Sequence, residues 1–169
     1  MDGMVTAAIV RISDSVTSTE QIDPLIARVV QAFSTIDVSV IPTLYSRDDV
    51  RDIAQAVEVA GLNQVDVVIT IGGTGISPLD YTARAMDPLL RFDIPGIPEA
   101  IRAYAYSHGD TSALLWRCRA GVLVAGPKRI LVVNTADTDL GVEAALNTLI
   151  PLLPIALTTI HKNNNTRQL

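Results

Sequence analysis

A glycine-rich segment near the middle of the chain has the residue types of a phosphate site. An apolar run, residues 67–71, leads directly into Gly72, Gly73, Thr74 and Gly75. Because glycine has no side chain, the backbone N–H groups of such a segment can converge on one anion. A helix beginning just beyond the glycines would add partial positive charge at its N-terminus. The segment therefore predicts a backbone cradle for phosphate.

Two polar residues, Asp80 and Thr82, follow the glycines where another element is expected to begin. A carboxylate beside a phosphate cradle usually needs a cation, so Asp80 suggests Mg²⁺ bridging to phosphate oxygens. Asp80 and the glycines also have purely structural interpretations that require no ligand. Asp80 has the chemistry of a helix cap, and the glycines could simply form a tight turn that requires positive φ. No Lys-Ser/Thr pair follows the glycines, so the segment is not a Walker A loop.

Asp48 and Asp49 follow the second predicted strand. Ser46 with Asp49 three residues later resembles a capping box that opens a helix toward Ile53. Carboxylates from two different strand ends, such as Asp48 and Asp80, can also converge on one Mg²⁺ ion. The sequence thus offers a catalytic, metal-binding pair.

Other candidates have equally ordinary alternatives. Ser13 and Asp14 end the first predicted strand, where they could face a ligand or simply form a turn. Glu99 places a favourable charge in a helix first turn. Arg117 could bind phosphate, cover apolar surface or pair with a carboxylate. Trp116 and Cys118 are expected to pack rather than to catalyse.

The elements that would position these residues alternate between strand and helix. Strand patterns at 5–11, 36–41 and 67–71 are separated by helical spacing at 22–33 and 53–60. Successive βα units predict a parallel sheet with helices on both faces, and ligand sites in such sheets lie outside the carboxyl ends of the strands. The glycine turn is at that end.

The second half of the chain continues the pattern after a break at Pro95 and Pro98. We expect a helix from about 99 to 107, followed by strands at 122–125 and 130–133 that are joined by a turn. We also expect a closing helix at 140–149, which Pro151 and Pro154 interrupt.

Length and composition indicate one domain. The chain has 169 residues, of which 49% are hydrophobic, with a mean hydropathy of +0.34. That composition is sufficient for one buried core, which we place at 1–161, followed by a polar, flexible tail at 162–169.

Charge and cysteine content exclude several classes of function. A net charge of −5 and a pI near 4.8 argue against binding to nucleic acid or to anionic membranes. The single cysteine, Cys118, rules out an internal disulfide framework or a cysteine-cluster zinc site. We expect no signal peptide and no uncharged run of the roughly 18 residues needed to span a membrane, and therefore a cytoplasmic protein.

The order and spacing of these segments resemble the molybdopterin adenylyltransferase family, which includes MogA, MoaB and the G domains of gephyrin-like proteins. The resemblance covers roughly residues 5–149. The matching segments are Ile12-Ser13-Asp14, Thr70 to Gly75, Asp80-Tyr81-Thr82, Pro95 to Glu99, and Arg117 with Ala120-Gly121-Val122.

This resemblance implies a three-layer α/β/α sandwich around a mostly parallel sheet, usually trimeric. It implies binding of molybdopterin and Mg-ATP, transfer of AMP to the pterin phosphate with release of pyrophosphate, and a partner protein for the later insertion of molybdate. Asp48 and Asp80 would be the catalytic and Mg²⁺-binding residues. The remaining binding residues would be Ser13, Asp14, Gly72, Gly73, Thr74, Gly75, Thr82 and Glu99.

The chain also departs from the family pattern. The loop at 15–19 is shortened, Arg84 replaces an acidic residue, and Trp116 replaces a serine. The Leu-Pro-Gly-Ser-Pro loop after the last strand is replaced by residues 135–139, which bring in Asp137 and Asp139. These changes leave two further hypotheses open. One is a non-catalytic molybdopterin-binding or assembly protein, and the other is a pocket adapted to another phosphorylated small molecule.

Overall fold

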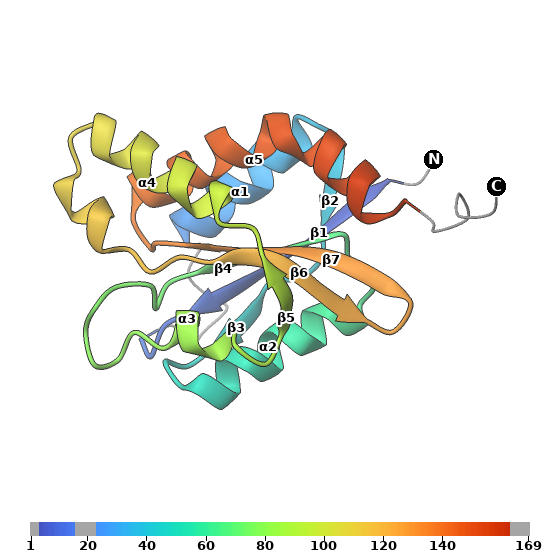
Figure 1. Ribbon diagram of the computed structural model, residues 1–169, viewed down its shortest axis with the longest axis horizontal. Helices are drawn as coiled ribbons and strands as arrows, with labels where there is room; N and C mark the ends of the chain where they lie inside the picture. The colour runs from blue at the N-terminus through green and yellow to red at the C-terminus, as the bar shows by residue number, and fades with distance from the viewer. Residues whose placement is uncertain (1–3, 16–22, 163–169) are drawn as a thin grey trace.

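The computed structural model describes residues 4–15 and 23–162. Its strands form one sheet, and helices cover both faces (Figure 1). The strands are β1 (Val5–Ile12), β2 (Val38–Val40), β3 (Leu44–Ser46), β4 (Val67–Ile71), β5 (Leu90–Asp93), β6 (Ala120–Ala125) and β7 (Lys128–Thr135). The helices are α1 (Pro24–Ser34), α2 (Val50–Leu62), α3 (Thr82–Ala85), α4 (Gly96–Ser107) and α5 (Asp139–Ile160), with a 3₁₀ turn, η1, at Thr111–Leu115.

The sheet is mostly parallel. Its order is β2-β1-β4-β7-β6-β5, and β3 also pairs with β1. Among the described strands, two pairings are antiparallel: β5 with β6, and β6 with β7. In the parallel part, Arg11 on β1 pairs with Ile71 on β4, which pairs with Thr135 on β7. The three strands therefore end at one edge, where a ligand crevice is expected. The predicted α/β fold is confirmed.

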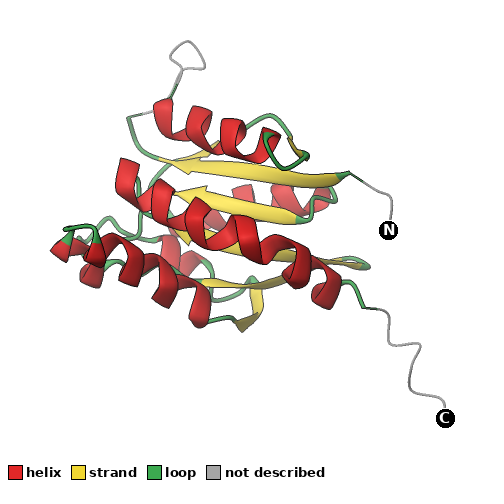
Figure 2. Cartoon of the chain, turned by 90° about the horizontal axis from the view of Figure 1, so that it is seen from above, coloured by secondary structure: helices red, strands yellow, loops and turns green. Residues whose placement is uncertain are grey.

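Two cores lie on opposite faces of the sheet, because successive strand residues point to opposite sides. Ile9 and Ile69 face the side of α1, α4 and α5, whereas Val10 and Val68 face α2 and α3. All of these side chains are at most 1% exposed. Figure 2 shows the resulting layers, with the sheet between its helices. The sandwich positions the carboxyl edge of the sheet rigidly.

Helix α5 is longer than expected. Pro151 and Pro154 do not end it, and it continues to Ile160. Both prolines are exposed, so water can bind the carbonyl groups that lose a helical N–H partner. On the other side of the helix Leu149 and Leu153 are buried, and this packing outweighs the local cost of proline.

Helix α5 also corrects the expectation about uncharged runs, since residues 144–161 carry no acidic or basic side chain apart from His161. Among the described helices it is the one long and apolar enough to cross a membrane by length and composition. Within its most apolar window 44% is buried inside the molecule, where it packs against α1, α4 and β7. It is a core helix of this fold.

The structure differs from the sequence-based expectation at two further elements, α4 and β5, where the local sequence pattern is weak. Helix α4 begins at Gly96 rather than near 99, because the first-turn N–H groups need no helical partner and Pro98 is tolerated there. Strand β5 was not expected, because its run of four residues is short and three of the four are exposed. The hairpin of β6 and β7 was predicted correctly, although both strands are longer than expected.

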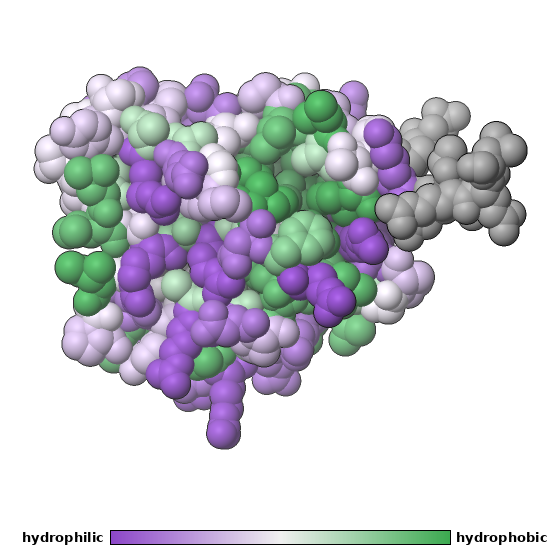
Figure 3. All heavy atoms as spheres, viewed as in Figure 1, coloured by the Kyte–Doolittle hydropathy of each residue, from purple (hydrophilic) through white to green (hydrophobic). Residues whose placement is uncertain are grey.

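An apolar groove of about 470 Å³ lies between α5 and strands β5 to β7. Apolar side chains gather there on the face shown in Figure 3. Phe92 and Ile155, which line it, are 51% and 66% exposed. Contiguous exposed apolar surface of this kind commonly marks an interaction site.

Candidate functional site

The glycine turn leaves β4 in a conformation that needs glycine. Gly72 has φ of 113° and Gly73 has φ of 65°, both in the left-handed region. The Gly72 N–H donates to the carbonyl of Thr135 on the neighbouring strand, at 3.0 Å. A Cβ atom at Gly72 would collide with the backbone carbonyl of Ile12. The structural interpretation of these glycines is therefore correct, and their contact with a ligand stays a prediction.

Thr82 fixes this turn from the other side. It is fully buried, its hydroxyl donates to the Gly72 carbonyl at 2.8 Å, and its N–H donates to the Gly73 carbonyl at 3.0 Å. A Cβ atom at Gly73 would strike the Thr82 hydroxyl and lie 3.4 Å from Asp48 Oδ1. The structure thus brings Gly73, Thr82 and Asp48 together, with Thr82 acting on the shape of the turn.

Asp80 lies over the last glycine of the loop. Its Oδ2 accepts from the Ser77 N–H at 2.7 Å and would lie 2.7 Å from a Cβ atom on Gly75. The N-cap of α3 is Tyr81, and no side chain of the described residues caps it. The helix-cap alternative for Asp80 is therefore wrong, because its carboxylate turns back onto the loop.

Asp48 stands at the centre of a group of carboxylates. Its N–H donates to Asp14 Oδ1 at 3.0 Å. Partial burial raises the pKa of Asp48, and the negative charges of Asp14, Asp80 and Asp137 raise it further. The charges of three carboxylates from three other loops therefore act on Asp48 at the carboxyl edge of the sheet. Asp137 was not among the predicted site residues.

Asp49 has a structural role that differs from the expected one. It is itself the N-cap of α2, and its Oδ1 accepts from the N–H groups of Arg51 and Asp52, at 2.8 and 3.1 Å. Ser46 belongs to β3, and its hydroxyl donates to the Arg47 carbonyl. The capping box that we expected from Ser46 to Asp49 is wrong, because the strand continues to Ser46.

Arg11 is a buried cation that sequence reasoning missed. Its guanidinium donates to Asp23 at 2.7 Å and to the carbonyls of Ile12 and Ile71, and it lies 3.8 Å from Asp137. Burial acts to raise the pKa of Asp23, but the hydrogen bonds and charge of Arg11 prevail and hold it below the ordinary value. The sequence signal that could have identified Arg11 is its positive charge within an otherwise apolar predicted strand.

Arg117 holds the glycine loop rather than presenting its charge to the crevice. Its side chain donates to the carbonyls of Gly75 and Asp80, at 2.7 and 2.6 Å, and its N–H donates to the Thr74 carbonyl. Neighbouring Trp116 and Cys118 are buried, as expected for packing residues. Burial raises the pKa of the Cys118 thiol to about 11, which keeps it protonated and unreactive at neutral pH.

The loop after β7 divides its two carboxylates between different environments. Asp137 turns toward Arg11 and Asp48. Thr138 is the N-cap of α5, where its hydroxyl accepts from the Gly141 N–H at 2.9 Å. Asp139 is 84% exposed and lies 3.8 Å from Arg28. Of the two replacement carboxylates, only Asp137 faces the site.

The remaining predicted residues lie in varied places. Ser13 adjoins the acidic group, and its N–H donates to the Ser46 carbonyl at 2.9 Å. Thr74 is buried beside Cys118. Glu99 is exposed in the first turn of α4, and within the described residues it makes no side-chain hydrogen bond to the others. Arg84 is exposed on α3. The altered loop at 15–19 and the tail at 163–169 fall, but for Ser15, outside the described residues.

The acidic group suits a hydrated divalent cation better than a closed metal cage. Among the described residues, no three His, Cys, Asp or Glu side chains are arranged to enclose an ion. Mg²⁺ is usually held by one or two carboxylates, with waters and substrate phosphates completing its shell. Because burial and neighbouring carboxylates both disfavour the charged form of Asp48 and raise its pKa, a cation beside Asp48 and Asp80 would relieve this cost. The donor set therefore fits Mg²⁺.

Comparison with known proteins places this site in a family. A family described as "Probable molybdopterin binding domain" matches residues 8–162. The chain belongs to the molybdopterin-binding domain family. Molybdenum cofactor biosynthesis protein B of Staphylococcus carnosus is 33% identical over 153 residues, which cover 89% of this chain and 86% of the relative.

Solved structures of similar proteins have the same architecture. The molybdopterin biosynthesis Mog protein of Mycobacterium ulcerans superposes with a TM-score of 0.82 at 31% identity, over 92% of this chain and 99% of that one. The tungsten cofactor synthesizing protein MoaB of Pyrococcus furiosus gives a TM-score of 0.84 at 21% identity, over 94% and 98% of the two chains. The latter likeness supports the fold alone. The family places the chain among proteins of molybdenum cofactor biosynthesis.

Proposed function

We propose that this protein transfers AMP from Mg-ATP to molybdopterin during molybdenum cofactor biosynthesis. The observation that carries the proposal is the convergence of Asp48 with Asp14, Asp80 and Asp137 beside the glycine turn. Family membership and a relative named as a molybdenum cofactor biosynthesis protein support it. The proposal includes Mg²⁺ as cofactor, ATP as co-substrate and a cytoplasmic location.

In the proposed reaction an oxygen of the pterin phosphate forms a bond to the α-phosphorus of ATP, and the bond from that phosphorus to the bridging oxygen breaks to release pyrophosphate. The protein contributes position and electrostatics rather than a covalent intermediate. Asp48 and Asp80 would hold Mg²⁺, which when bound neutralises phosphate charge. The backbone of the turn at Gly72 to Gly75 would orient a phosphate group, while Thr82 and Arg117 keep that turn in shape.

The direct test is pyrophosphate release by purified protein supplied with molybdopterin and Mg-ATP. We expect release that requires both substrates and falls at least about a hundredfold in Asp80→Asn, the scale of losing one positioned electrostatic group. Asp139→Asn is the matched control, since Asp139 faces solvent on the neighbouring loop. Unchanged release by Asp80→Asn would refute the assignment of Asp80.

A second function is a non-catalytic molybdopterin-binding or assembly protein. The inward position of Asp137 favours it, because this carboxylate faces a region that would receive phosphate groups. Tight pterin binding without Mg-ATP binding would select this alternative, whereas saturable Mg-ATP binding would oppose it. A pocket for another phosphorylated small molecule would show nucleotide or phosphate binding that molybdopterin does not displace.

The proposal also includes a homotrimer and a partner that inserts molybdate. The apolar groove around Phe92 and Ile155 supports burial against another protein surface. Sedimentation equilibrium tests the trimer. Phe92→Asp should shift the population toward monomer, and a monomeric wild-type protein would remove this part of the proposal.

A further inference from the structure

Two adjoining cavities open at the end of the molecule where β1 begins and α5 ends, away from the acidic group (Figure 1). The larger one, of about 620 Å³, lies between β1, β2 and the second half of α5. The smaller one, of about 430 Å³, lies between the turn that joins β6 to β7 and the end of α5. Lys128 and His161 line both cavities, which therefore meet at these side chains and together form what we call the amino-end pocket. The larger cavity alone has the roughly 300–1,000 Å³ typical of small-molecule sites.

The larger cavity has aliphatic walls. Val5 and Val38 line it from the sheet, and Ile150, Leu153 and Leu157 line it from α5. Leu153 and Leu157 also belong to the hydrophobic core, so the floor of the cavity is continuous with the core beneath it. Apart from the His161 ring, none of its described lining residues is aromatic, so the cavity suits a saturated chain better than a flat ring.

The smaller cavity is basic, although the chain as a whole carries a net charge of −5. Its charged or titratable lining residues are Lys128, Arg129, His161 and Lys162, and none of its described lining residues is acidic. Asp66 lines the larger cavity, and its carboxylate is matched by Lys128 Nζ at 2.9 Å. Lys128 also donates to the Gln64 carbonyl, which leaves one of its three ammonium donors for a ligand.

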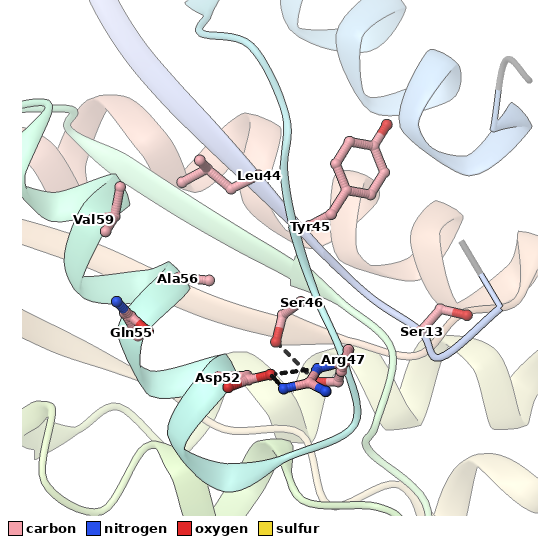
Figure 4. Close-up of a pocket in the computed structure, with 9 residues that line it drawn as sticks. All are labelled: Ser13, Leu44, Tyr45, Ser46, Arg47, Asp52, Gln55, Ala56 and Val59. Carbon is pink, nitrogen blue, oxygen red and sulfur yellow. Dashed lines mark hydrogen bonds and ion pairs between the residues drawn. The ribbon is translucent and has the colours of Figure 1, made fainter. Parts of the chain in front are cut away.

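The remaining cations of the amino-end pocket are not neutralised by the described residues. Arg129 and Lys162 are exposed, and neither side chain forms an ion pair within the described part of the chain. The cavity between β3 and α2 is different, because Arg47 Nε and Nη2 there both lie 2.7 Å from Asp52 Oδ2 (Figure 4). The amino-end pocket therefore retains positive charge that an anionic ligand can use.

We propose that the amino-end pocket binds a small aliphatic carboxylate. The chain would lie in the larger cavity against Val38 and Leu157, where its burial removes apolar surface from water. The head would lie where the two cavities meet and accept the remaining donor of Lys128, since one free donor suits a singly charged group. Arg129 and Lys162 at the rim would add longer-range attraction.

This site is independent of the proposed adenylyl transfer. It lies at the amino ends of β1, β4 and β7, whereas Asp48 and Asp80 lie beyond their carboxyl ends. The carboxylate and Mg-ATP would therefore bind together without competing. A protein that fails to bind Mg-ATP would refute the proposed function and leave this inference standing.

The test is isothermal titration calorimetry of the full chain with three probes, each below its micelle concentration. Decanoate carries both features, decyltrimethylammonium has the same chain length with the opposite charge, and acetate has the head alone. We expect saturable binding of decanoate, at least about tenfold tighter than that of either other probe. Equal binding of decanoate and decyltrimethylammonium, or no binding of decanoate, would overturn the inference.

A substitution that fills the larger cavity locates the binding. Thr158 lines this cavity and is exposed, so Thr158→Trp should retain the melting temperature and weaken decanoate binding at least about tenfold. Asn147→Trp is the matched control, at an exposed position of α5 that does not line the amino-end pocket. Equal decanoate affinity in the two variants would overturn the assignment to this pocket.

A charge reversal tests the basic rim. Lys162→Glu should weaken decanoate binding by about fivefold, and the loss should shrink at high salt, because exposed charges are screened. Arg51→Glu makes the same change in net charge on α2 and should have no effect. Equal losses in both variants would show that the rim charge has no specific role and would contradict the proposed position of the head.

Two further outcomes would also overturn the inference. Displacement of decanoate by saturating Mg-ATP would place the carboxylate in the acidic crevice rather than in the amino-end pocket. Binding to phosphatidylglycerol vesicles without binding to free decanoate would mean that this face contacts a membrane instead of enclosing a single chain.

Discussion

The two ends of the sheet differ in how they accommodate partly buried carboxylates. At the amino end, Asp66 is 14% exposed and its carboxylate is fully matched, with Lys128 Nζ at 2.9 Å, the Thr6 N–H at 2.9 Å and His161 Nε2 at 3.8 Å. At the carboxyl end, partial burial raises the pKa of Asp48, and three neighbouring carboxylates raise it further.

Cations are present near the carboxyl end, but their shortest contacts lie outside the group of Asp14, Asp48, Asp80 and Asp137. Arg11 pairs with Asp23 at 2.7 Å and approaches Asp137 only to 3.8 Å, Arg47 pairs with Asp52, and Arg117 donates to loop carbonyls. The amino end therefore uses its charges for stability, whereas the carboxyl end retains negative charge that a bound cation can neutralise. Uncompensated charge at one end of an otherwise well-paired fold is typical of a functional site.

Among the substitutions that test this difference between the two ends, replacing Gly72 in the turn should have the largest effect on stability and on ligand binding. Gly72→Ala places a Cβ against the Ile12 carbonyl at a left-handed φ, so we expect a loss of at least about 3 kcal/mol in unfolding free energy and no measurable Mg-ATP binding. Gly126→Ala, at the amino end of β7, has φ of 59° and open space around it, and should cost about 1 kcal/mol. Thermal melts and calorimetry of both variants measure the difference. Equal effects would show that the turn has room for a side chain.

Removing the buried cation at the carboxyl end should come next. Arg11→Met leaves Asp23 buried without its partner, which predicts a loss of about 3 kcal/mol. Arg28→Met removes a surface pair with Glu143 in which both side chains are 40% exposed, and should cost less than about 1 kcal/mol. Denaturant unfolding compares them, and similar midpoints would mean that Arg11 is not a structural cation.

Asp66→Asn tests the matched charge at the amino end. The substitution weakens charged hydrogen bonds to Lys128 and Thr6, so we expect a loss of about 2 kcal/mol, or roughly 4–8 °C in melting temperature. Mg-ATP binding should survive, since the cluster lies at the far end of the sheet. A stable Asp66→Asn protein would remove the contrast between the two ends.

Asp48→Asn should have the smallest effect on stability, and with the opposite sign. Because the folded pKa of Asp48 is raised, its favourable contribution is complete below the unfolded pKa of about 3.9 and is lost as pH rises through the folded pKa. The variant should therefore melt roughly 1–3 °C higher than wild type at pH 7, a gain that fades toward pH 4. A lower melting temperature at pH 7 would contradict the account.

The elements and the glycine turn could be predicted because their signals are local. Apolar runs followed by glycines identify β4 and its turn, and the position of Asp80 follows directly. Other features depend on tertiary context. Pro151 is tolerated in α5 because it faces solvent, and the cap of α2 is Asp49 because β3 extends to Ser46. The spacing of residues in the sequence predicts neither the exposure of Pro151 nor the end of β3 at Ser46.

The location of the candidate site could be predicted from the sequence, but most of its side-chain contacts could not. Asp48 and Asp80 lie close enough for their charges to interact, as expected, and Asp14 joins them. Arg11 and Asp137 are more than a hundred residues apart in sequence, and only the side-by-side pairing of β1, β4 and β7 brings them together. Glu99 lies in the first turn of α4, and its proposed contact with a ligand stays a prediction.

The central claim is that the unmatched carboxylates bind a cation that carries phosphate. Calorimetric titration of Mg-ATP into wild type, Asp48→Asn and Asp66→Asn tests it most directly. The account predicts saturable binding by wild type and Asp66→Asn, abolished by excess EDTA, and at least a tenfold loss in Asp48→Asn despite its higher melting temperature. Wild-type affinity in Asp48→Asn, or binding that persists in EDTA, would contradict it.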